Sequence, residues 1–545
     1  MKRTRLSRGA VAAVATLALT LAACSSGGGK GTPSGTGGAS SGIVSYASNE
    51  PENPLIPADT NEVGGGLALQ NIFAMPVYYQ ADGSTAMDAA ESITSSDNTL
   101  WTIKLKAGQK FSDGSAVDAQ SFVDAWQYGA SDPTFLNQYW FANFQGYQDD
   151  PGPDAKNPKT YPNSLALTVV DATTFTAQLA SPQSDFVTTL GYTAFAPLPQ
   201  AFFADSKTFG QKPIGNGPYQ LDKWVHDQAI SLKPNPNYDG PRKAQNGGIE
   251  LRAYQTQDAA YADLLSNNLD LVQQVPETAL GSYKGDLGNR AVDQAAAIWQ
   301  GFTIPTTLAH FSGDEGKLRR AAISYAINRA DVASKIFNNT RTPAVDFTSP
   351  VLAGFNGNIQ GSEVTHFDAQ KAKDLWAQAD AISKWDGKFQ LAYNSDGNHQ
   401  AWVDAVMNQL KNTLGIDAAG KPYPDFASLR KDVNARSIGA ASRAGWQFDY
   451  PGASNILGAM YVTGAGSNDG DYSDPAFDDL YKKGVTAKTV DEANRDFEQA
   501  QQVLFQDLPT IPLFYSSVNA GYSTLVQNVK YGWDSWPILY QVTKN

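Results

Sequence analysis

A short apolar run that ends at Cys24 constrains this chain more than any other feature of its sequence. The run, VAAVATLALTLAA, follows a basic end that carries Lys2, Arg3, Arg5 and Arg8. A positive end, a short apolar stretch and small residues before a cutting point are typical of an export signal. The length and flanks of the run disfavour the alternative, a membrane anchor that is never cut. We therefore expect residues 1–23 to be removed. No other apolar run is long enough to span a bilayer, so we expect the rest of the chain to fold without crossing the membrane.

Cys24 is the only cysteine among 545 residues, so it has no partner for an internal disulfide. Leu21-Ala22-Ala23-Cys24 resembles a bacterial lipobox, which implies a thioether-linked diacylglycerol on Cys24. The next residues, SSGGGKGTPSGTGGASSG, are too rich in Gly and Ser to bury a core, so residues 24–42 are predicted to form a lipidated end and a flexible tether. The predicted location is the outer face of the cytoplasmic membrane. High Gly and Ala content favours a high-GC Gram-positive host.

The length and the composition indicate a globular protein with more than one domain. A chain of 545 residues exceeds what one hydrophobic core usually organises. Its 42% hydrophobic and 17% charged residues exclude global disorder as well as collagen-like and coiled-coil architectures. A formal net charge of -13 argues against a nucleic-acid partner and against an anionic membrane surface held by charge.

Short strand-like runs alternate with helical patterns along the chain, which predicts an α/β or α+β protein. Asp118 is a predicted N-cap, and Gly415 is predicted to end a helix. The predicted strands are TLWTIKLKAGQKF, a hairpin in ALTVVDATTFTAQL, KFQLAYNSD, and an edge or crossover strand in DLPTIPLFYSS. The predicted helices are DAQSFVDAWQYGA, a helix pair in LRRAAISYAINRADVASKIF, DAQKAKDLWAQAD and HQAWVDAVMNQLKNTLG.

An unusual mixture of charges and aromatic rings lies between residues 443 and 450. Two charges of opposite sign stand there among three aromatic residues: Arg443, Trp446, Phe448, Asp449 and Tyr450. A catalytic centre, a packed strand edge and a pocket for a zwitterion are all compatible with this mixture.

Signatures of enzymes and metal sites are weak. The four histidines, His226, His310, His366 and His399, lie far apart without an HExxH-type pair. GNGPY, residues 215–219, lacks the helix start that a phosphate loop needs. SNDGDYSDPAFDDL is acidic but does not have the ligand spacing of an EF-hand, so a solvated loop is favoured. We therefore predict no enzymatic activity, no metal and no cofactor.

Several long motifs follow one another along the chain: WTIKLKAGQKFSDGSAVDAQSFVDAW, KPIGNGPYQLDKWVHDQAISLKPNPNYDG, LRRAAISYAINRADV, FDAQKAKDLWAQAD, GWQFDYPGASNIL and DLPTIPLFYSS. In this order they resemble the extracytoplasmic solute-binding proteins of ABC importers, specifically the peptide/nickel-type family (family 5). The resemblance runs from about residue 43 to about residue 530. It implies a two-lobed periplasmic-binding-protein-like α/β fold (type II, class C cluster) with a hinge between the lobes. Carried over, the first lobe takes residues 43–296 and returns at 510–545, and the second takes 297–509.

The resemblance also implies how residues 443 to 450 bind a ligand. Oligopeptide-binding members carry an Arg-x-Gly-Trp-x-x-Asp pattern whose Asp holds the peptide ammonium, and it stands here as Arg443-Ala444-Gly445-Trp446-Gln447-Phe448-Asp449. Charge alone suits Asp449 for an ammonium and Arg443 for a carboxylate. Trp446 and Tyr450 can cover ligand side chains of many kinds. The alternative is that Asp449 only starts a turn before Pro451 and that Trp446 belongs to the core.

Other candidate ligand-binding residues follow from their place in the family pattern. Glu62-Val63-Gly64, in TNEVGGGLALQNIF, is expected to run alongside the ligand and exchange backbone hydrogen bonds; a flexible surface loop is the alternative. Tyr139 is a candidate for the cleft, or else ordinary aromatic core. Phe426 stands where family members often have a Trp, and Arg436 stands near a family arginine without clean spacing. The side-chain pockets therefore differ from the usual pattern.

The sequence thus favours a monomeric receptor, lipid-anchored at Cys24, that captures oligopeptides for an ABC permease with cytoplasmic ATPase subunits. A receptor of the same family for a sugar, nickel or another solute is the first alternative. A signalling or adhesion lipoprotein that reuses the fold is the second.

Overall fold

The structure is a computed structural model that describes residues 40–148 and 165–544. The described residues form one compact unit. The predicted export signal, Cys24 and most of the predicted tether lie outside the described residues. The end of the predicted tether, however, belongs to the folded body, because Ser40 N donates to Gln245 O and Gly42 N to Lys544 O, each at 3.0 Å.

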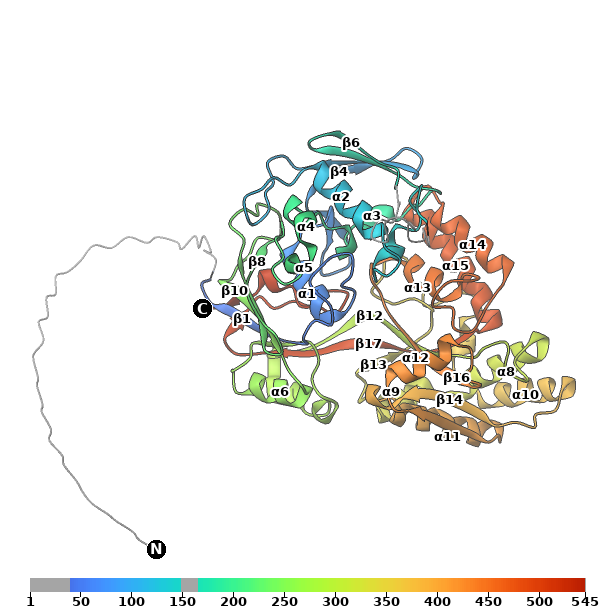
Figure 1. The fold of residues 1–545 in the computed structure, drawn as a ribbon. Coiled ribbons are helices and arrows are strands. Elements are labelled where there is room, and N and C mark those ends of the chain that lie inside the picture. Colours follow the sequence, from blue (N-terminus) through green and yellow to red (C-terminus); the bar gives the residue numbers. More distant parts are fainter. Residues whose placement is uncertain (1–39, 149–164, 545) are drawn as a thin grey trace, which may run out of the picture. The chain divides into compact units, whose positions relative to one another are not determined.

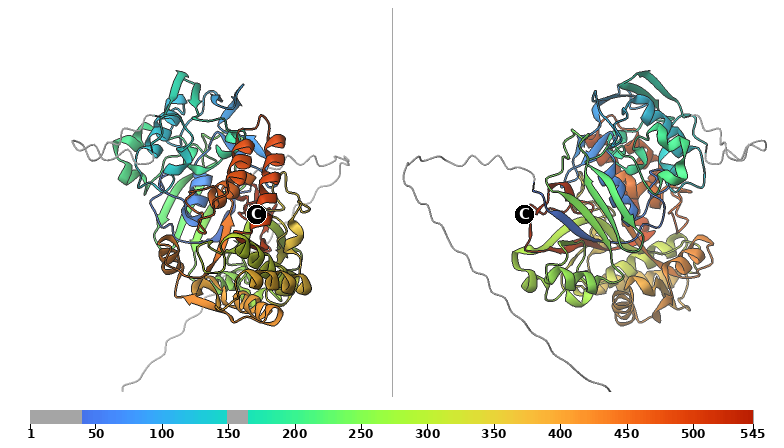
Figure 2. Two further views of the ribbon diagram at one scale, coloured as in Figure 1. Left: turned by 90° about the vertical axis from the view of Figure 1, so that its right-hand side faces the viewer. Right: turned by 60° about the vertical axis from the view of Figure 1, so that its left-hand side comes forward.

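A large sheet of eleven strands organises the described residues. Its order is β15-β14-β16-β12-β17-β11-β1-β10-β9-β8, with β13 paired to β17 beside this path. The strands are β1 (Ile43–Ser48), β8 (Tyr219–Val225), β9 (Ala229–Pro234), β10 (Gly248–Ala253), β11 (Leu271–Val272), β12 (Ala291–Thr303), β13 (Arg341–Pro343), β14 (Phe389–Asn394), β15 (Ala418–Tyr423), β16 (Ala441–Gln447) and β17 (Thr510–Tyr522). The right-hand view of Figure 2 shows the β1 and β8–β10 end of this sheet, in blue and green.

Smaller sheets complete the β-structure of the described residues. A four-stranded antiparallel sheet has the order β4-β5-β7-β6, with β4 (Ala90–Thr94), β5 (Leu100–Leu105), β6 (Leu167–Asp171) and β7 (Thr174–Gln178). Two-stranded pairs are formed by β2 (Val77–Tyr79) with β3 (Thr85–Met87), and by β18 (Val526–Gln527) with β19 (Thr543–Lys544).

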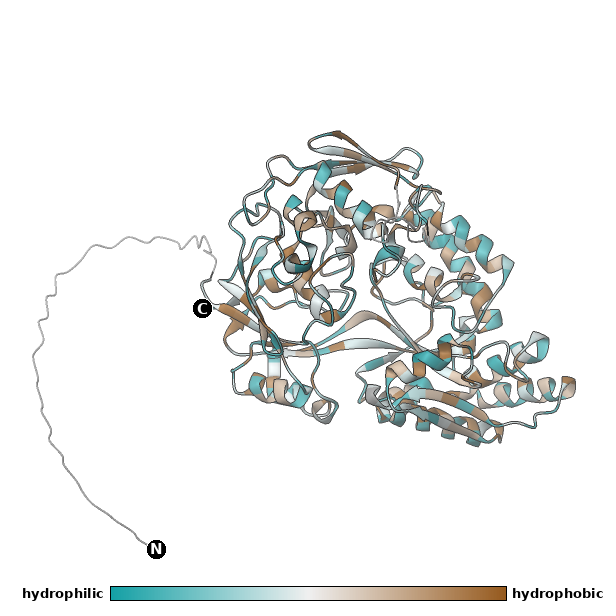
Figure 3. Ribbon diagram, in the orientation of Figure 1, coloured by the Kyte–Doolittle hydropathy of each residue, from teal (hydrophilic) through white to brown (hydrophobic). Residues whose placement is uncertain are grey.

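The helices lie around these sheets (Figure 1), and several alternate hydrophilic and hydrophobic residues along their length (Figure 3). In the first half of the chain they are α1 (Val63–Ile72), α2 (Ala119–Ala130), α3 (Phe186–Thr189), α4 (Gln200–Ala204), α5 (Ser206–Phe209), α6 (Gln257–Leu265) and α7 (Tyr283–Leu287). In the second half they are α8 (Gly313–Ala326), α9 (Arg329–Lys335), α10 (Ala369–Ile382), α11 (Gln400–Leu414), α12 (Phe426–Asn434), α13 (Ala453–Tyr461), α14 (Pro475–Val485) and α15 (Val490–Asp507).

Two large hydrophobic cores share the long strands β12 and β17. Along β12 the side chains change from the first core to the second between Ala296 and Ala297. Along β17 the change falls between Tyr515 and Val518. The two strands pair antiparallel and run side by side between the two groups of elements (Figure 1). We therefore propose residues 43–296 with 510–545 as one lobe and 297–509 as the other, with β12 and β17 crossing between them.

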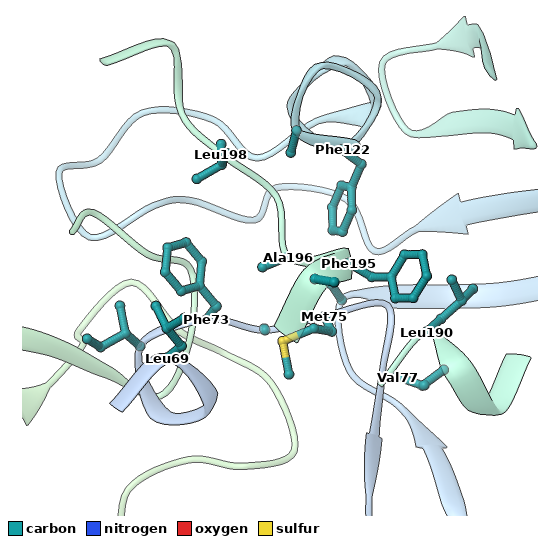
Figure 4. Packing of buried hydrophobic residues seen from close by; sticks show 14 of the residues in the cluster. Leu69, Phe73, Met75, Val77, Phe122, Leu190, Phe195, Ala196 and Leu198 are labelled. Carbon is teal, nitrogen blue, oxygen red and sulfur yellow. The ribbon is translucent and has the colours of Figure 1, made fainter. Parts of the chain in front are cut away.

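The first core packs aromatic and aliphatic side chains from segments that are far apart in sequence. Figure 4 shows Phe73 of the α1 end, Phe122 of α2 and Phe195 among them. The indole of Trp126 in α2 lies edge-on to the Phe195 ring, with ring centroids 5.2 Å apart, and its Nε1 donates to Phe195 O at 3.0 Å. Such pairs contribute about 0.5–1.5 kcal/mol beyond the burial of their area.

A buried ion pair fixes the C-terminal end of α1. Arg242 Nε donates to Asp88 Oδ2 at 2.6 Å, and both side chains are almost fully buried. The same guanidinium donates to Gln70 O and Phe73 O, each at 2.7 Å. A cation at the carbonyl end of a helix is favoured by the helix dipole, so this contact holds α1 in place.

Most of the elements predicted from sequence are confirmed. The predicted helices correspond to α2, α8 with α9, α10 and α11, and Gly415 ends α11 with φ +70°. The strands correspond to β5, the β6–β7 hairpin and β14. Of the two readings of DLPTIPLFYSS, the crossover strand is right and the edge strand is wrong, because β17 has neighbours on both sides.

We expect Asp118→Ala to lower the free energy of unfolding by about 1 kcal/mol, because it removes an N-cap. Asp118 accepts from Ser121 N at 2.9 Å, and Ser121 Oγ lies 3.3 Å from Asp118 N, which together form a capping box at the start of α2. Asp118→Asn, which keeps a capping oxygen, is the control and should retain most of the stability in urea unfolding. Equal losses in both variants would show that the cap contributes little.

Candidate functional site

Strand β16 presents one face of the predicted ligand motif to a cavity. Residues 442 and 444 are buried, whereas Arg443, Gly445 and Gln447 are partly or fully exposed, as expected from side chains that alternate along a strand. The antiparallel pairing with β12 sets Gly445 opposite Gln300 and Trp446 opposite Trp299. The motif is therefore carried on a strand in the middle of the large sheet and not on a loose loop.

This face borders a cavity of about 600 Å³ that contains two arginines, which we call the arginine cavity. Arg443 Nε donates to Asn394 Oδ1 at 2.8 Å, and its guanidinium lies over the Phe426 ring, 4.7 Å from the ring centroid. Arg341 contacts Gln300 Oε1 and lies over a phenylalanine ring. The cavity is also lined by Gly445, Trp446 and Gln447, so four of the predicted motif residues meet here.

Asp449 lies just beyond the end of β16 and is held by Asn455, a residue that the sequence analysis missed. Asn455 Nδ2 donates to Asp449 Oδ2 at 3.2 Å, and Asn455 Oδ1 accepts from Asp449 N at 3.2 Å and from Trp446 Nε1 at 2.6 Å. Burial raises the pKa of the Asp449 carboxyl to about 6, only partly offset by the Asn455 hydrogen bond. Among the described residues no Lys, Arg or His forms a salt bridge with Asp449. The carboxylate is thus partly buried and has no salt-bridge partner in the part of the chain that the structure describes.

Asp449 borders two further cavities. The first, which we call the acidic cavity, has a volume of about 190 Å³. Its lining includes three carboxylates and several aromatic rings: Glu62, Asp449, Asp534, Tyr79, Tyr192, Phe448, Trp533 and Trp536. It shares Gln447 and Val63 with the arginine cavity, so the two are neighbours along β16. A ligand that lies along this strand meets negative charge at one end and positive charge at the other.

The second, the aromatic cavity, has a volume of about 750 Å³. Tyr139, Trp140, Trp446 and Tyr450 line it together with Asp449. Tyr139 is about half exposed and stacks on Trp140, with ring centroids 5.6 Å apart. Tyr450 is buried, and its ring lies 5.8 Å from that of Trp140. The structure therefore places Tyr139 and Tyr450 beside the predicted ammonium-binding carboxylate.

Segments of the two proposed lobes touch next to the aromatic cavity. Ser184 N donates to Val485 O at 2.8 Å, and Asn98 Nδ2 donates to Ala487 O at 2.9 Å. Ser454 Oγ donates to the buried Asp185 carboxylate and lies 3.0 Å from Tyr450 Oη. These polar contacts close one side of the site around Asp449.

Residues 62–64 are placed differently from the expectation. Val63 and Gly64 form the first turn of α1, and Glu62 is its N-cap, with carboxylate oxygens 2.9 and 3.0 Å from Gly65 N. They do not form a flexible loop, because Val63 and Gly64 are helical and Glu62, whose backbone is extended, caps the helix with its side chain. The close approach that Gly64 permits is that of Asn49 O, 2.8 Å from where a Cβ would lie. Glu62 and Val63 nevertheless line the acidic cavity.

Three predicted residues, Gly64, Phe426 and Arg436, are not brought to the lining of these three cavities. Phe426 begins α12 and is about half exposed, and it reaches the site only through its contact with Arg443. Arg436 is engaged elsewhere: its Nε donates to both oxygens of Asp471, at 2.9 and 3.0 Å, and its Nη2 donates to Asn468 O at 3.0 Å. We therefore withdraw Arg436 as a ligand-binding residue.

The structure adds several residues that the sequence analysis did not single out. Asp534 and its two neighbouring tryptophans come from the WDSW run near the C-terminal end, Tyr79 ends β2, and Tyr192 follows α3. The charged residue between two tryptophans in WDSW repeats the mixture found at residues 443 to 450 and was the available signal. Asn455 had no such signal, because it lies in the first turn of α13, three residues after Gly452, among small and apolar residues.

Comparison with known families and relatives identifies the chain. Residues 85–468 match the family model of bacterial extracellular solute-binding proteins, family 5. The chain is 27% identical over 489 residues to the periplasmic murein peptide-binding protein MppA of Escherichia coli K12, covering 87% of each chain. It is 24% identical over 482 residues to the oligopeptide-binding protein OppA of Bacillus subtilis 168, covering 85% of each. These relatives are named as binding proteins and not as enzymes.

Solved structures show the same fold. The unliganded open form of the murein tripeptide binding protein MppA superposes with a TM-score of 0.76 at 24% identity, covering 94% of this chain and 99% of that one. This likeness confirms the predicted two-lobed type II α/β fold. Among the described residues, no helix combines the length and the apolar character needed to cross a membrane. With the family model covering well over half of its length, the chain belongs to family 5 of the bacterial extracellular solute-binding proteins.

Proposed function

We propose that this protein captures oligopeptides between its two lobes and delivers them to the permease of an ABC importer, while a lipid on Cys24 anchors it at the outer face of the cytoplasmic membrane. The observation that carries the proposal is the partly buried Asp449 carboxylate, which lacks a salt-bridge partner among the described residues and faces two cavities. A buried charge without a partner is costly, so a site that retains one is suited to a ligand that supplies the opposite charge.

The arrangement of charges matches the two ends of a peptide. The α-ammonium fits the acidic cavity at Asp449, and the carboxylate fits the arginine cavity, where the guanidinium groups of Arg443 and Arg341 supply positive charge. Between them β16 exposes Gly445 and Gln447, whose backbone can pair with an extended ligand. The aromatic cavity, with Trp446 and Tyr450, offers apolar surface without charged groups other than Asp449, which tolerates varied side chains.

The relatives support the peptide reading, since MppA is named for murein peptides and OppA for oligopeptides. Delivery to a permease is the role that peptide receptors of ABC importers share. Closure of the lobes on ligand requires only that the closed state bind it more tightly than the open one.

A ligand-dependent melting experiment tests the proposal. We expect a mixture of short peptides to raise the melting temperature, with a stabilisation of about 1.4 kcal/mol when the free peptide is at about ten times its Kd. Sugars and nickel should leave the melting temperature unchanged, because neither supplies an ammonium for Asp449. Stabilisation by a sugar or by nickel, and not by peptides, would contradict the proposal. Mass spectrometry of small molecules that co-purify with the protein identifies the natural ligand independently.

A further inference from the structure

The acidic cavity carries more negative charge than one peptide ammonium requires. Its lining has three carboxylates, Glu62, Asp449 and Asp534, and none of its lining residues is Lys, Arg or His. None of the three carboxylates forms a salt bridge within the part of the chain that the structure describes. If Asp449 holds the α-ammonium, two carboxylates remain.

Glu62 already has a partner within the protein. Both of its carboxylate oxygens lie within 3.0 Å of Gly65 N at the start of α1, where the helix dipole favours a negative charge. Its carboxylate is therefore held by the helix that it caps, although burial still raises the pKa of the group. Asp534 is the carboxylate left over.

Asp534 is fixed in place but not neutralised. Its Oδ1 accepts from Trp536 N at 3.0 Å, which holds the side chain in a tight turn, and its backbone oxygen accepts from Gln447 Nε2 at 3.3 Å. Burial raises the pKa of its carboxyl to about 6, and only backbone N–H groups act in the other direction. Through Gln447 it is connected to the same strand that leads to Asp449.

The walls around Asp534 suit a cation. Trp533 packs edge-on against Tyr79, with ring centroids 5.5 Å apart, and Trp536 lies against Gly66 of α1, where a Cβ would be 3.1 Å from the ring. Both tryptophans, with Tyr79 and Tyr192, line the cavity. Aromatic faces next to a carboxylate bind ammonium and guanidinium groups through the ring quadrupole as well as by charge.

From this geometry we propose that Asp534 and its aromatic neighbours form a subsite for a second cation on the ligand, namely the basic side chain of a peptide whose first residue is Lys or Arg. The α-ammonium binds Asp449, and the side-chain cation of the same residue binds Asp534 across the acidic cavity. The inference rests on the proposed function, because it takes Asp449 as the ammonium site. It makes this protein a receptor with a preference for peptides that begin with a basic residue.

Isothermal titration calorimetry with two matched pentapeptides, Lys-Ala-Ala-Ala-Ala and norleucine-Ala-Ala-Ala-Ala, tests this proposal. We expect the wild-type protein to bind the lysine peptide at least about tenfold more tightly, the lower end of the couplings measured for close charge pairs. Asp534→Asn should remove this preference and leave the norleucine peptide's affinity within about threefold of wild type. Asp239→Asn, at a fully exposed aspartate, is the matched control and should retain the preference.

The outcomes separate the two proposals. If both peptides bind equally to the wild-type protein, or if Asp534→Asn keeps the preference, the second-cation subsite is wrong while peptide capture stands. If neither peptide binds, the peptide function fails and the subsite fails with it. Asp534→Ser, whose hydroxyl can still accept from Trp536 N, replaces Asp534→Asn if that variant does not fold, and circular dichroism checks the fold of each.

Discussion

Asp449→Ala is expected to weaken the binding of a short peptide by about 2–5 kcal/mol, the range for removing one partner of a desolvated charge pair. The fold should remain intact, because the side chain of Asp449 makes only one hydrogen bond, to Asn455, and otherwise faces cavities. Since burial disfavours the charged carboxylate, the free variant should melt at or above the wild-type temperature at neutral pH. Calorimetry and thermal unfolding measure the two effects separately.

An acetylated peptide shows whether the lost energy belongs to the ammonium. N-acetylation removes the positive charge of the peptide and should cost the wild-type protein about as much as Asp449→Ala does. The variant should then be almost insensitive to acetylation, as a double-mutant cycle requires of two interacting partners. Asp239→Ala, at an exposed aspartate, is the control and should bind both peptides like the wild type. If acetylation weakens peptide binding to the Asp449→Ala variant as much as it weakens binding to the wild type, Asp449 does not bind the ammonium.

Peptide affinity is expected to fall as the pH drops below about 6, by roughly 30-fold between pH 7 and pH 4.5 for a peptide with one ammonium. Burial raises the pKa of Asp449 to about 6 in the free protein, so below that pH the carboxyl takes up a proton. An ammonium binds the ionised form of Asp449, so the carboxyl must lose its proton before the peptide binds. Below the pKa of Asp449 the affinity therefore falls up to tenfold for each pH unit. The lysine peptide should lose more than the norleucine peptide, because the pKa of Asp534 is also raised to about 6.

Of the other groups around Asp449, the tyrosines do not titrate in this range, whereas the nearby carboxyl groups have pKa values that burial raises. Four tyrosines interact with its charge, namely Tyr79, Tyr139, Tyr192 and Tyr450, and burial raises the pKa of each above its ordinary value near 10. Asp185 lies nearby with its pKa raised by burial, and Glu62 faces the same cavity. Asp449→Asn is therefore the decisive control: its weaker binding of the norleucine peptide should change little between pH 7 and pH 4.5. If the variant instead keeps the wild-type fall in affinity between pH 7 and pH 4.5, another group causes the effect.

The sequence predicted the helices and strands whose signals are local. Asp118 and Gly415 mark helix ends by capping chemistry that depends on neighbours only a few residues away. The two prolines of DLPTIPLFYSS left two readings open, because a proline is tolerated wherever its missing N–H is not needed for pairing. Only the pairing of β17 with both β11 and β12 decides between them, and this pairing joins segments more than 200 residues apart.

The candidate site was predicted where one segment carries it and missed where separate segments converge. Arg443, Trp446 and Asp449 stand on one strand and its end, so their spacing reveals them. Asp534 reaches the same cavity from the far end of the chain, and no local pattern reports that meeting. Arg436 was wrong for the reverse reason: it is near the motif in sequence, but its pairing with Asp471 turns the guanidinium to another loop.

Hydrogen bonds that join residues 539–544 to residues 42 and 246 limit when the first core can fold during synthesis. Gly42 N donates to Lys544 O, and Asn246 Nδ2 donates to Leu539 O and Val542 O at 2.9 and 2.8 Å. Although residues 43–296 are synthesised earlier, the first core lacks β17 and these contacts until residues 510–544 have been made. Partly made chains of this kind expose apolar surface and depend on chaperones. Nascent chains should therefore remain protease-sensitive until residues 510–544 have left the ribosome.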